Sequence, residues 1–200
     1  VNLDSQSVSA VTYGGTPLTR VGTGVANGTN VRSEFYYLLN PPTGMASIVV
    51  TLSATTRGIM CGATSWANVD QSTPLGTPVT ANDAGSDTAS VVVTSAAGNI
   101  VADVLGEGND NTATVGDGQT ERWNDSVPNS GPDFLGAGST EAGAASVTMS
   151  WKFSSAPWAQ IAVEIKQDST PTPTATNTPT PTNTATATPT DTPTPTETPT

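Results

Sequence analysis

A strict dipeptide repeat ends the chain and limits what that part of it can fold into. From Thr170 to Thr200 every even-numbered residue is threonine, and the residues between them are only Pro, Ala, Asn, Asp or Glu. Such a segment has almost no apolar surface to bury, and each proline pushes the preceding residue out of the helical region. We therefore expect an extended polyproline II tail that makes no core. The predicted domains are a folded body over residues 1–167 and this tail over residues 168–200.

The threonine density of the tail favours O-glycosylation, because Ser/Thr-rich stretches with proline are typical of mucin-like stalks. The alternative is a bare linker to a further domain or to a cell-wall anchor. The residues expected to carry glycans are Thr170, Thr172, Thr174, Thr176, Thr178, Thr180, Thr182, Thr184, Thr186, Thr188, Thr190, Thr192, Thr194, Thr196, Thr198 and Thr200.

Charge and composition exclude several classes of function. The chain has 17 Asp and Glu against 6 Lys and Arg, a net charge of -11 and no histidine. Nucleic acid is a poor partner for such a surface, and neither a Ser-His-Asp triad nor a His-ligated zinc can form. No run approaches the roughly 18 to 20 apolar residues that span a bilayer, so no membrane span is predicted. The sequence starts at Val1 without a basic and apolar leader, so we expect a removed leader or a fragment.

The body consists of short β segments separated by Gly, Pro, Asn and Asp, without sustained helical periodicity. Gly14-Gly15 suits a tight hairpin, and residues 96–99 suit a turn between two β-branched runs. The predicted fold class is therefore all-β, an antiparallel two-sheet sandwich of jelly-roll type. The expected strands cover residues 7–13, 17–22, 31–39, 46–52, 58–66, 90–94, 100–105, 119–123, 144–153 and 158–166.

The last two expected strands alternate apolar residues with polar or small ones. Each is therefore expected to have one buried face and one wetter face. Ala162 and Glu164 fall on the wetter face, and Trp151 falls in phase with the apolar residues and is expected in the core.

Five segments of the body carry a family resemblance. They are Val-Thr-Tyr-Gly-Gly at 11–15, Phe-Tyr-Tyr-Leu-Leu-Asn-Pro-Pro at 35–42, Val-Asp-Gln-Ser-Thr-Pro-Leu-Gly at 69–76, and Met-Ser-Trp-Lys-Phe at 149–153 with Trp-Ala at 158–159. Together they resemble a β-sandwich domain that recurs in large secreted bacterial surface proteins. The resemblance implies a sandwich fold and an extracellular or cell-surface location, and it transfers no catalytic residue.

The N-terminus departs from that pattern, because few residues precede the Val-Thr-Tyr-Gly-Gly hairpin where such domains usually have a further strand or two. A sandwich that lacks a strand exposes an apolar groove and unpaired backbone, which invites a strand from another subunit. A head-to-tail contact of this kind propagates into a fibre. The expected partners are thus other copies of the chain, and the alternative is an incomplete fragment.

Acidic residues alternate with glycines between residues 103 and 125, and oxygen ligands on Gly-rich loops are what Ca²⁺ prefers. The spacing does not match an EF-hand, because Val115 replaces the required glycine. A looser calcium site is the functional interpretation, and a solvated acidic loop is the alternative. The candidate metal ligands are Asp103, Glu107, Asp110 and Asp117.

Trp123 lies among Glu121, Arg122, Asn124 and Asp125, and this polar setting predicts a partly exposed ring. A partly exposed tryptophan can stack on a sugar ring, so Trp123 is the candidate glycan-binding residue. Cys61 has no second cysteine to pair with. Its apolar neighbours predict a buried, inert thiol, and an intermolecular disulfide is the alternative.

These observations predict a non-enzymatic structural protein. We expect a secreted subunit of an extracellular filament or surface layer, with a glycosylated Thr/Pro arm and no required cofactor beyond possible Ca²⁺. The alternative is a carbohydrate-binding or adhesive module of a larger surface protein, with the tail as its linker.

Overall fold

The computed structural model describes residues 2–3, 6–55, 58–109, 112–127 and 134–168. These residues form β-strands and no helix, which confirms the all-β class. The strands are β1 Asn2–Leu3, β2 Val8–Tyr13, β3 Thr16–Pro17, β4 Thr19–Asn27, β5 Val31–Tyr37, β6 Ile48–Leu52, β7 Gly58–Ile59, β8 Val79–Val93, β9 Ile100–Glu107, β10 Thr114–Val115, β11 Thr120–Val127, β12 Phe134–Ala142 and β13 Val147–Ile165. The folded unit spans Val1–Ser169, and Thr170–Thr200 form a separate unit that lies outside the described residues.

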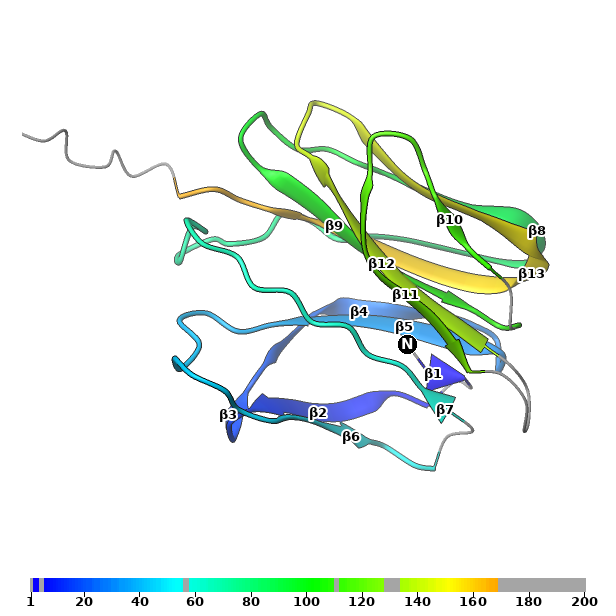
Figure 1. Ribbon diagram of the computed structural model, residues 1–200, viewed down its shortest axis with the longest axis horizontal. Helices are drawn as coiled ribbons and strands as arrows, with labels where there is room; N and C mark the ends of the chain where they lie inside the picture. The colour runs from blue at the N-terminus through cyan, green and yellow to red at the C-terminus, as the bar shows by residue number, and fades with distance from the viewer. Residues whose placement is uncertain (1, 4–5, 56–57, 110–111, 128–133, 169–200) are drawn as a thin grey trace, which may run out of the picture. The chain divides into compact units, whose positions relative to one another are not determined.

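Antiparallel ladders join the strands into one large sheet and two small ones. The large sheet has the order β8-β13-β9-β12-β11, with β10 also paired to β13, so that the last strand lies between β8 and β9. The small sheets have the orders β4-β5-β1-β7 and β3-β2-β6. They lie on one side of the large sheet (Figure 1). This layering is consistent with the predicted sandwich, although two separate sheets share the second layer.

The β8–β13 ribbon folds back over the large sheet. The Gln160 side chain donates a hydrogen bond to the backbone oxygen of Met149 at 3.2 Å, although both residues belong to β13. Eleven residues of straight strand would span about 36 Å, so the strand must reverse between them. The ladder with β8 is irregular at Ala156, where bulges allow the bend.

This reversal buries both faces of β9 and of the second half of β13. The expectation of a wetter face at Ala162 and Glu164 is therefore wrong, because both residues are buried under the folded-back ribbon. Trp151 is 1% exposed, which confirms its place in the core. On the opposite face of the large sheet, Val104 and Ile161 pack against Val31 of β5.

Several expected strands differ from those observed. The two strands expected at 144–153 and 158–166 are the single strand β13, and the strand expected at 90–94 is the end of the much longer β8. Only Gly58–Ile59 of the strand expected at 58–66 is a strand, and β12 was not expected. The Gly14-Gly15 hairpin is confirmed, since both glycines have the positive φ angles, 56° and 83°, that a type I′ turn requires.

Candidate functional site

A cavity of about 730 Å³ lies between the large sheet and the two small sheets. Its walls come from β2, β5 and β6 on one side and from β9, β11 and β12 on the other, and residues 59–75 close part of it. The lining is largely apolar and includes Val11, Phe35, Ile48, Val104 and Ile165. A space that a sandwich normally fills with its own side chains is here left partly empty.

The strand pairing shows which strand edge borders the cavity. β1 pairs with β5 at Asn2↔Arg32 and with β7 at Asn2↔Ile59, so β5 and β7 are two strand spacings apart, about 9.5 Å. β5 then continues to Tyr37 and the chain after β7 continues to Thr64, and both stretches line the cavity. No strand of the described residues lies between these two stretches. We call this space the β5–β7 gap.

The gap has a defined register. In an antiparallel pair, moving one residue back along β1 moves one residue forward along its partners. Counting back from Asn2, and leaving out the position of Val1, which lies outside the described residues, a strand on this line would face Glu34 and then Phe35 of β5. On its other side it would face residues 61 and 62. The gap can thus accept one extended strand with hydrogen-bonding partners available at the β5 edge.

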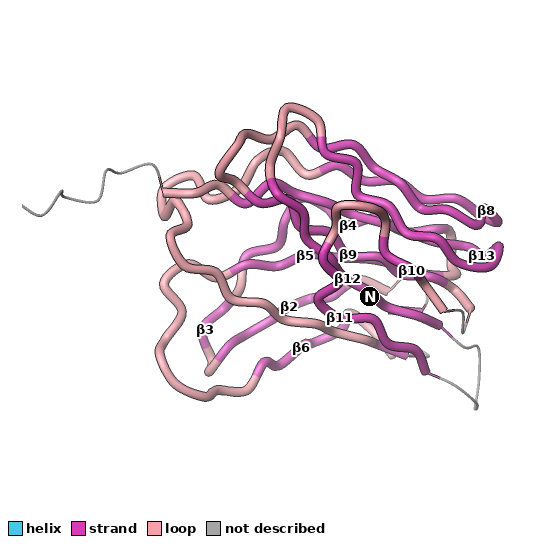
Figure 2. The backbone as a smooth tube through the Cα atoms, turned by 45° about the horizontal axis from the view of Figure 1, so that its top comes forward, coloured by secondary structure: helices cyan, strands magenta, loops and turns pink. Residues whose placement is uncertain are grey.

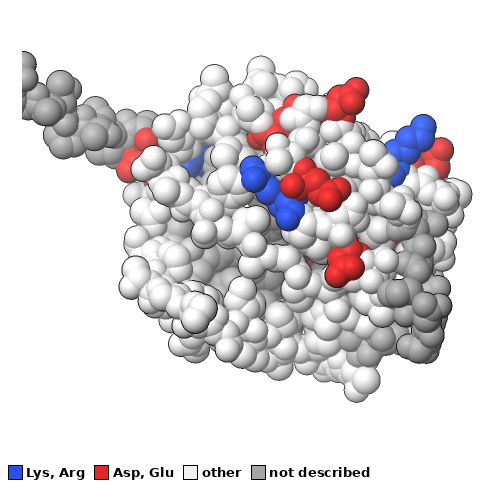
Figure 3. Space-filling view, in the orientation of Figure 1, with Lys and Arg blue, Asp and Glu red and all other residues white. Residues whose placement is uncertain are grey.

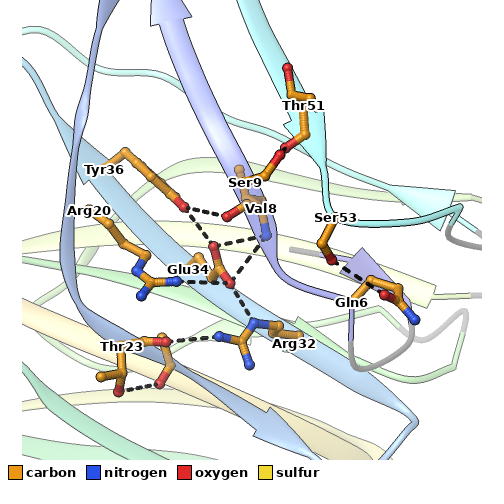
Figure 4. Close-up of polar contacts among 11 residues, drawn as sticks. Gln6, Val8, Ser9, Arg20, Thr23, Arg32, Glu34, Tyr36, Thr51 and Ser53 are labelled. Carbon is orange, nitrogen blue, oxygen red and sulfur yellow. Dashed lines mark hydrogen bonds and ion pairs between the residues drawn. The ribbon is translucent and has the colours of Figure 1, made fainter.

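A polar cluster around Glu34 fixes β5 against β2 (Figure 4). The Glu34 carboxylate accepts hydrogen bonds from Arg32 Nε at 2.5 Å, from the Tyr36 hydroxyl at 2.8 Å and from the Val8 backbone N–H at 3.3 Å. Arg20 lies 3.9 Å away, and the Glu34 side chain is only 3% exposed. Burial raises the pKa of Tyr36 to about 12, and its hydrogen bond to Glu34 acts in the same direction.

The Glu34 cluster was missed in the sequence. The signal available was the spacing of Arg32, Glu34 and Tyr36, which places all three side chains on one face of a strand. The polar side chains on that face bond to other groups of the protein. What β5 offers to a partner is therefore its backbone edge at the gap, and the Glu34 cluster holds this edge in position.

Trp123 lines the cavity and is half-buried, as its polar neighbours predicted. Its ring lies against the backbone of three glycines, Gly136 and Gly138 of β12 and Gly62 after β7. A Cβ atom at Gly62 would lie 2.2 Å from Trp123 Nε1, and one at Gly138 would lie 2.4 Å from the same atom. These glycines are needed because backbone packs directly on the indole. These contacts cover part of the ring, and Trp123 also lines the cavity.

The segment that covers the cavity, residues 60–76, is held unevenly. Its second half pairs with the chain at the end of β13, where Lys166 N–H donates to Pro74 O at 2.8 Å and Gly76 N–H donates to Glu164 O at 3.0 Å. Its first half is held at Trp66, whose ring centroid lies 5.3 Å from Arg122 Cζ in a cation–π contact. The first half thus borders the gap with fewer backbone constraints.

Cys61 lies in this first half and lines the cavity. The prediction of a buried thiol is wrong, because Cys61 is exposed. The expected strand over residues 58–66 ends at Ile59, so the alternation that would have turned Cys61 inward does not continue. An exposed thiol beside the gap is accessible to reagents.

The predicted calcium ligands fall into different environments. Asp103 is 3% exposed and lies inside the folded-back sheet. Its carboxylate accepts hydrogen bonds from Ser139 Oγ at 2.6 Å, Gln160 Nε2 at 2.7 Å and Trp151 Nε1 at 2.8 Å. Burial raises the pKa of Asp103, and these hydrogen bonds oppose that shift. The Asp103 carboxylate therefore ties β9 to β12 and β13.

The other candidate ligands do not gather around Asp103. Glu107 is fully buried at the end of β9 and accepts a hydrogen bond from the Asn109 N–H at 3.0 Å, whereas Asp117 is exposed in the loop after β10. Asp110 lies outside the described residues. Within the described part of the chain no three acidic or cysteine side chains are grouped so as to hold a metal ion. The calcium site stays a prediction without a geometric basis in these residues.

The sixteen predicted O-glycosylation sites, from Thr170 to Thr200, all lie outside the described residues. We find no matching family model, curated protein or solved structure for the chain. Among the described residues no helix has the length and apolar character needed to cross a membrane.

Proposed function

We propose that this chain is a structural subunit that assembles with copies of itself outside the cell, each copy placing an extended strand in the β5–β7 gap of the next. The observation that carries the proposal is the gap itself. It is lined largely by apolar side chains, and beyond β1 the edge of β5 has no strand partner among the described residues. Strand addition at such an edge supplies main-chain hydrogen bonds, and side-chain pockets supply specificity.

Burial supplies the driving force. An apolar side chain that becomes fully buried contributes roughly 1.5 to 3 kcal/mol. An inserted strand would place alternate side chains toward the cavity, where Phe35, Val104 and Trp123 are available as partners. Because association itself costs several kcal/mol, these side chains would act together with the main-chain hydrogen bonds at the β5 edge.

We assign the inserted strand to the folded body of a neighbour. The gap has chain on both sides, and each proline at an odd-numbered position of the tail removes a backbone N–H from one edge. We assign the Thr/Pro tail to a hydrated, O-glycosylated arm. Mass spectrometry of the native secreted protein should find hexose-type mass additions confined to residues 170–200.

The proposed function requires no catalysis. Histidine is absent from the sequence, and the buried carboxylates of Asp103 and Glu34 are engaged in hydrogen bonds that hold strands together. Both acids therefore have a structural role that explains their burial.

The exposed thiol of Cys61 allows a direct test. Pyrene maleimide attached to Cys61 should block the gap and prevent the formation of polymers longer than a dimer in sedimentation velocity, while the unlabelled protein forms polymers. The matched control carries Cys61→Ser and Ala97→Cys, which moves the same label to an exposed turn between β8 and β9. This control should polymerise like the unlabelled protein. Equal polymerisation of both labelled proteins, or a permanently monomeric unlabelled protein, would contradict the proposal.

A glycan-binding module is the second candidate, because Trp66 and Trp123 both line the cavity. Under that function the body would bind polysaccharide as a monomer, and Trp123→Ala would abolish binding. The variant should remain folded, with Trp151 still buried. Binding by the monomer without polymerisation would favour this candidate over assembly.

A further inference from the structure

A second surface suited to self-association lies at β6, on the outer side of the cavity wall. β6 ends the sheet with the order β3-β2-β6, and β2 is its only strand partner among the described residues. Figure 2 shows β6 at the margin of the folded unit. Its outer row of backbone N–H and C=O groups is therefore available to a further strand.

The side chains around this edge are apolar and exposed. Val49 is 53% exposed, Ile48 is 47% exposed, and Met45 just before the strand is fully exposed. Val49 does not line the cavity, since it points to the opposite face from Ile48 and Val50. A single exposed valine needs no explanation, but here Val49 on the outer face and Ile48 on the face toward the cavity both expose apolar side chains at the same edge.

The usual protection against edge pairing is missing. Exposed edges commonly carry lysine or another charge, a proline or a covering loop. Residues 35–56 contain no Asp, Glu, Lys or Arg, and β6 itself contains no proline. In Figure 3 the acidic and basic side chains gather over the large sheet, and the lower part of the face shown carries none.

We infer that β6 pairs antiparallel with β6 of a second copy, about a two-fold axis. The charge distribution selects this occupant. Two chains of net charge -11 repel each other over most of their surface, and the uncharged edge is where they can approach closely. An antiparallel pair of identical strands is self-complementary. If one residue of the first copy pairs with a second residue of the other copy, the reverse pairing also forms, so the contact closes as a dimer. This surface is distinct from the β5–β7 gap.

Sedimentation equilibrium of protein alkylated at Cys61 tests the inference. Because alkylation blocks the gap, the result for the β6 dimer does not depend on whether the proposed polymer forms. The alkylated protein should form a reversible dimer. Val49→Lys should weaken dimerisation by at least about tenfold, because it places a charge on the edge. Val92→Lys is the matched control, since Val92 is 55% exposed on a strand of the large sheet, and it should leave the dimer unchanged.

Two results would overturn the inference. One is an alkylated protein that stays monomeric at every concentration, which would leave β6 to a partner of different sequence. The other is an equal loss of dimer in Val49→Lys and Val92→Lys, which would indicate a general charge effect. Thermal melting of both variants checks that each is folded, as expected for substitutions at half-exposed positions.

Discussion

Asp103 combines two roles that are usually separate, a buried charge and a cross-link between strands. Its carboxylate lies where the folded-back half of β13 meets β9, and every neighbour that contacts it is a hydrogen-bond donor. A carboxylate can accept all of these bonds, whereas an amide of the same shape turns its NH₂ group toward some of the donors. The residue is therefore specific in charge as well as in size.

We expect Asp103→Asn to lower the free energy of unfolding by about 2 to 3 kcal/mol, because charge-assisted hydrogen bonds are lost and buried donors lose their acceptor. Urea denaturation measures this difference. Asp87→Asn is the control, since Asp87 is exposed and should change stability by less than about 0.5 kcal/mol. Equal effects at both positions would show that the Asp103 network does not stabilise the fold.

The difference in stability between wild type and Asp103→Asn should also depend on pH, in a direction that follows from the pKa of Asp103. Burial raises the pKa of Asp103 in the folded state above its usual value of 3.8, so the folded protein takes up this proton at a higher pH than the unfolded chain does. The contribution of Asp103 to stability therefore increases as the pH falls from neutral through its folded-state pKa, and it is constant below the unfolded value. The stability difference between wild type and Asp103→Asn should widen over that range.

The β8–β13 ribbon is the element that decides how the interior is filled. Its second half lies within the large sheet, and its first half covers that sheet from above, with Val91, Val93 and Met149 packed on Val101. A straight ribbon would leave Asp103, Gln160 and Glu164 exposed to water. The bend at Ala156 thus converts an ordinary half-wet strand into one that is buried on both faces.

Met149→Ala should destabilise the fold by about 2 to 5 kcal/mol, because Met149 is 0% exposed and its loss leaves a cavity between the two halves of the ribbon. Val92→Ala, on the neighbouring strand but 55% exposed, should cost less than about 0.5 kcal/mol. Denaturation midpoints compare the two. A small effect of Met149→Ala would mean that the covering half of the ribbon is not packed as described.

The ribbon also explains which parts of the fold the sequence could predict. The apolar alternation of residues 147–153 and the Gly14-Gly15 hairpin depend on local periodicity and turn chemistry, and both were predicted correctly. The bend that joins 147–153 to 158–165 was not, because Ser154, Ser155 and Pro157 are typical of a loop. β12 was missed for a similar reason, since Gly136, Ala137 and Gly138 have low strand propensity, and the two glycines leave room for the ring of Trp123.

The candidate site was less predictable than the strands. The cavity joins residues from β2, β5, β9, β11 and residues 60–75, which no local pattern relates. The expectation of a groove followed from the short N-terminus, and the half-buried Trp123 from its polar neighbours. The predicted calcium ligands were chosen because they lie close together in the sequence. Strand geometry separates them, because Asp103 points into the covered face of β9 while Asp117 lies in an exposed loop.

At the scale of the whole molecule, the net charge and the two proposed contact surfaces have opposite effects on assembly. In the proposed assembly the net charge of -11 opposes contact between copies, while the gap and the β6 edge are the surfaces proposed to bring them together. Charged residues are few near β6 and more frequent over the large sheet (Figure 3). Assembly therefore depends on how strongly the solution screens the charges that do not take part in the contacts.

Ionic strength should control the rate of assembly. The Debye length falls from about 30 Å at roughly 10 mM salt to about 8 Å at roughly 150 mM, which removes most repulsion between copies before contact. We expect light scattering to show polymerisation at least about tenfold faster at the higher concentration. A comparison of CaCl₂ with MgCl₂ at equal concentration tests the predicted calcium site separately from general screening. A rate that does not depend on salt would contradict the role of charge. A rate much higher with Ca²⁺ than with Mg²⁺ would instead indicate a specific calcium site that includes residues such as Asp110.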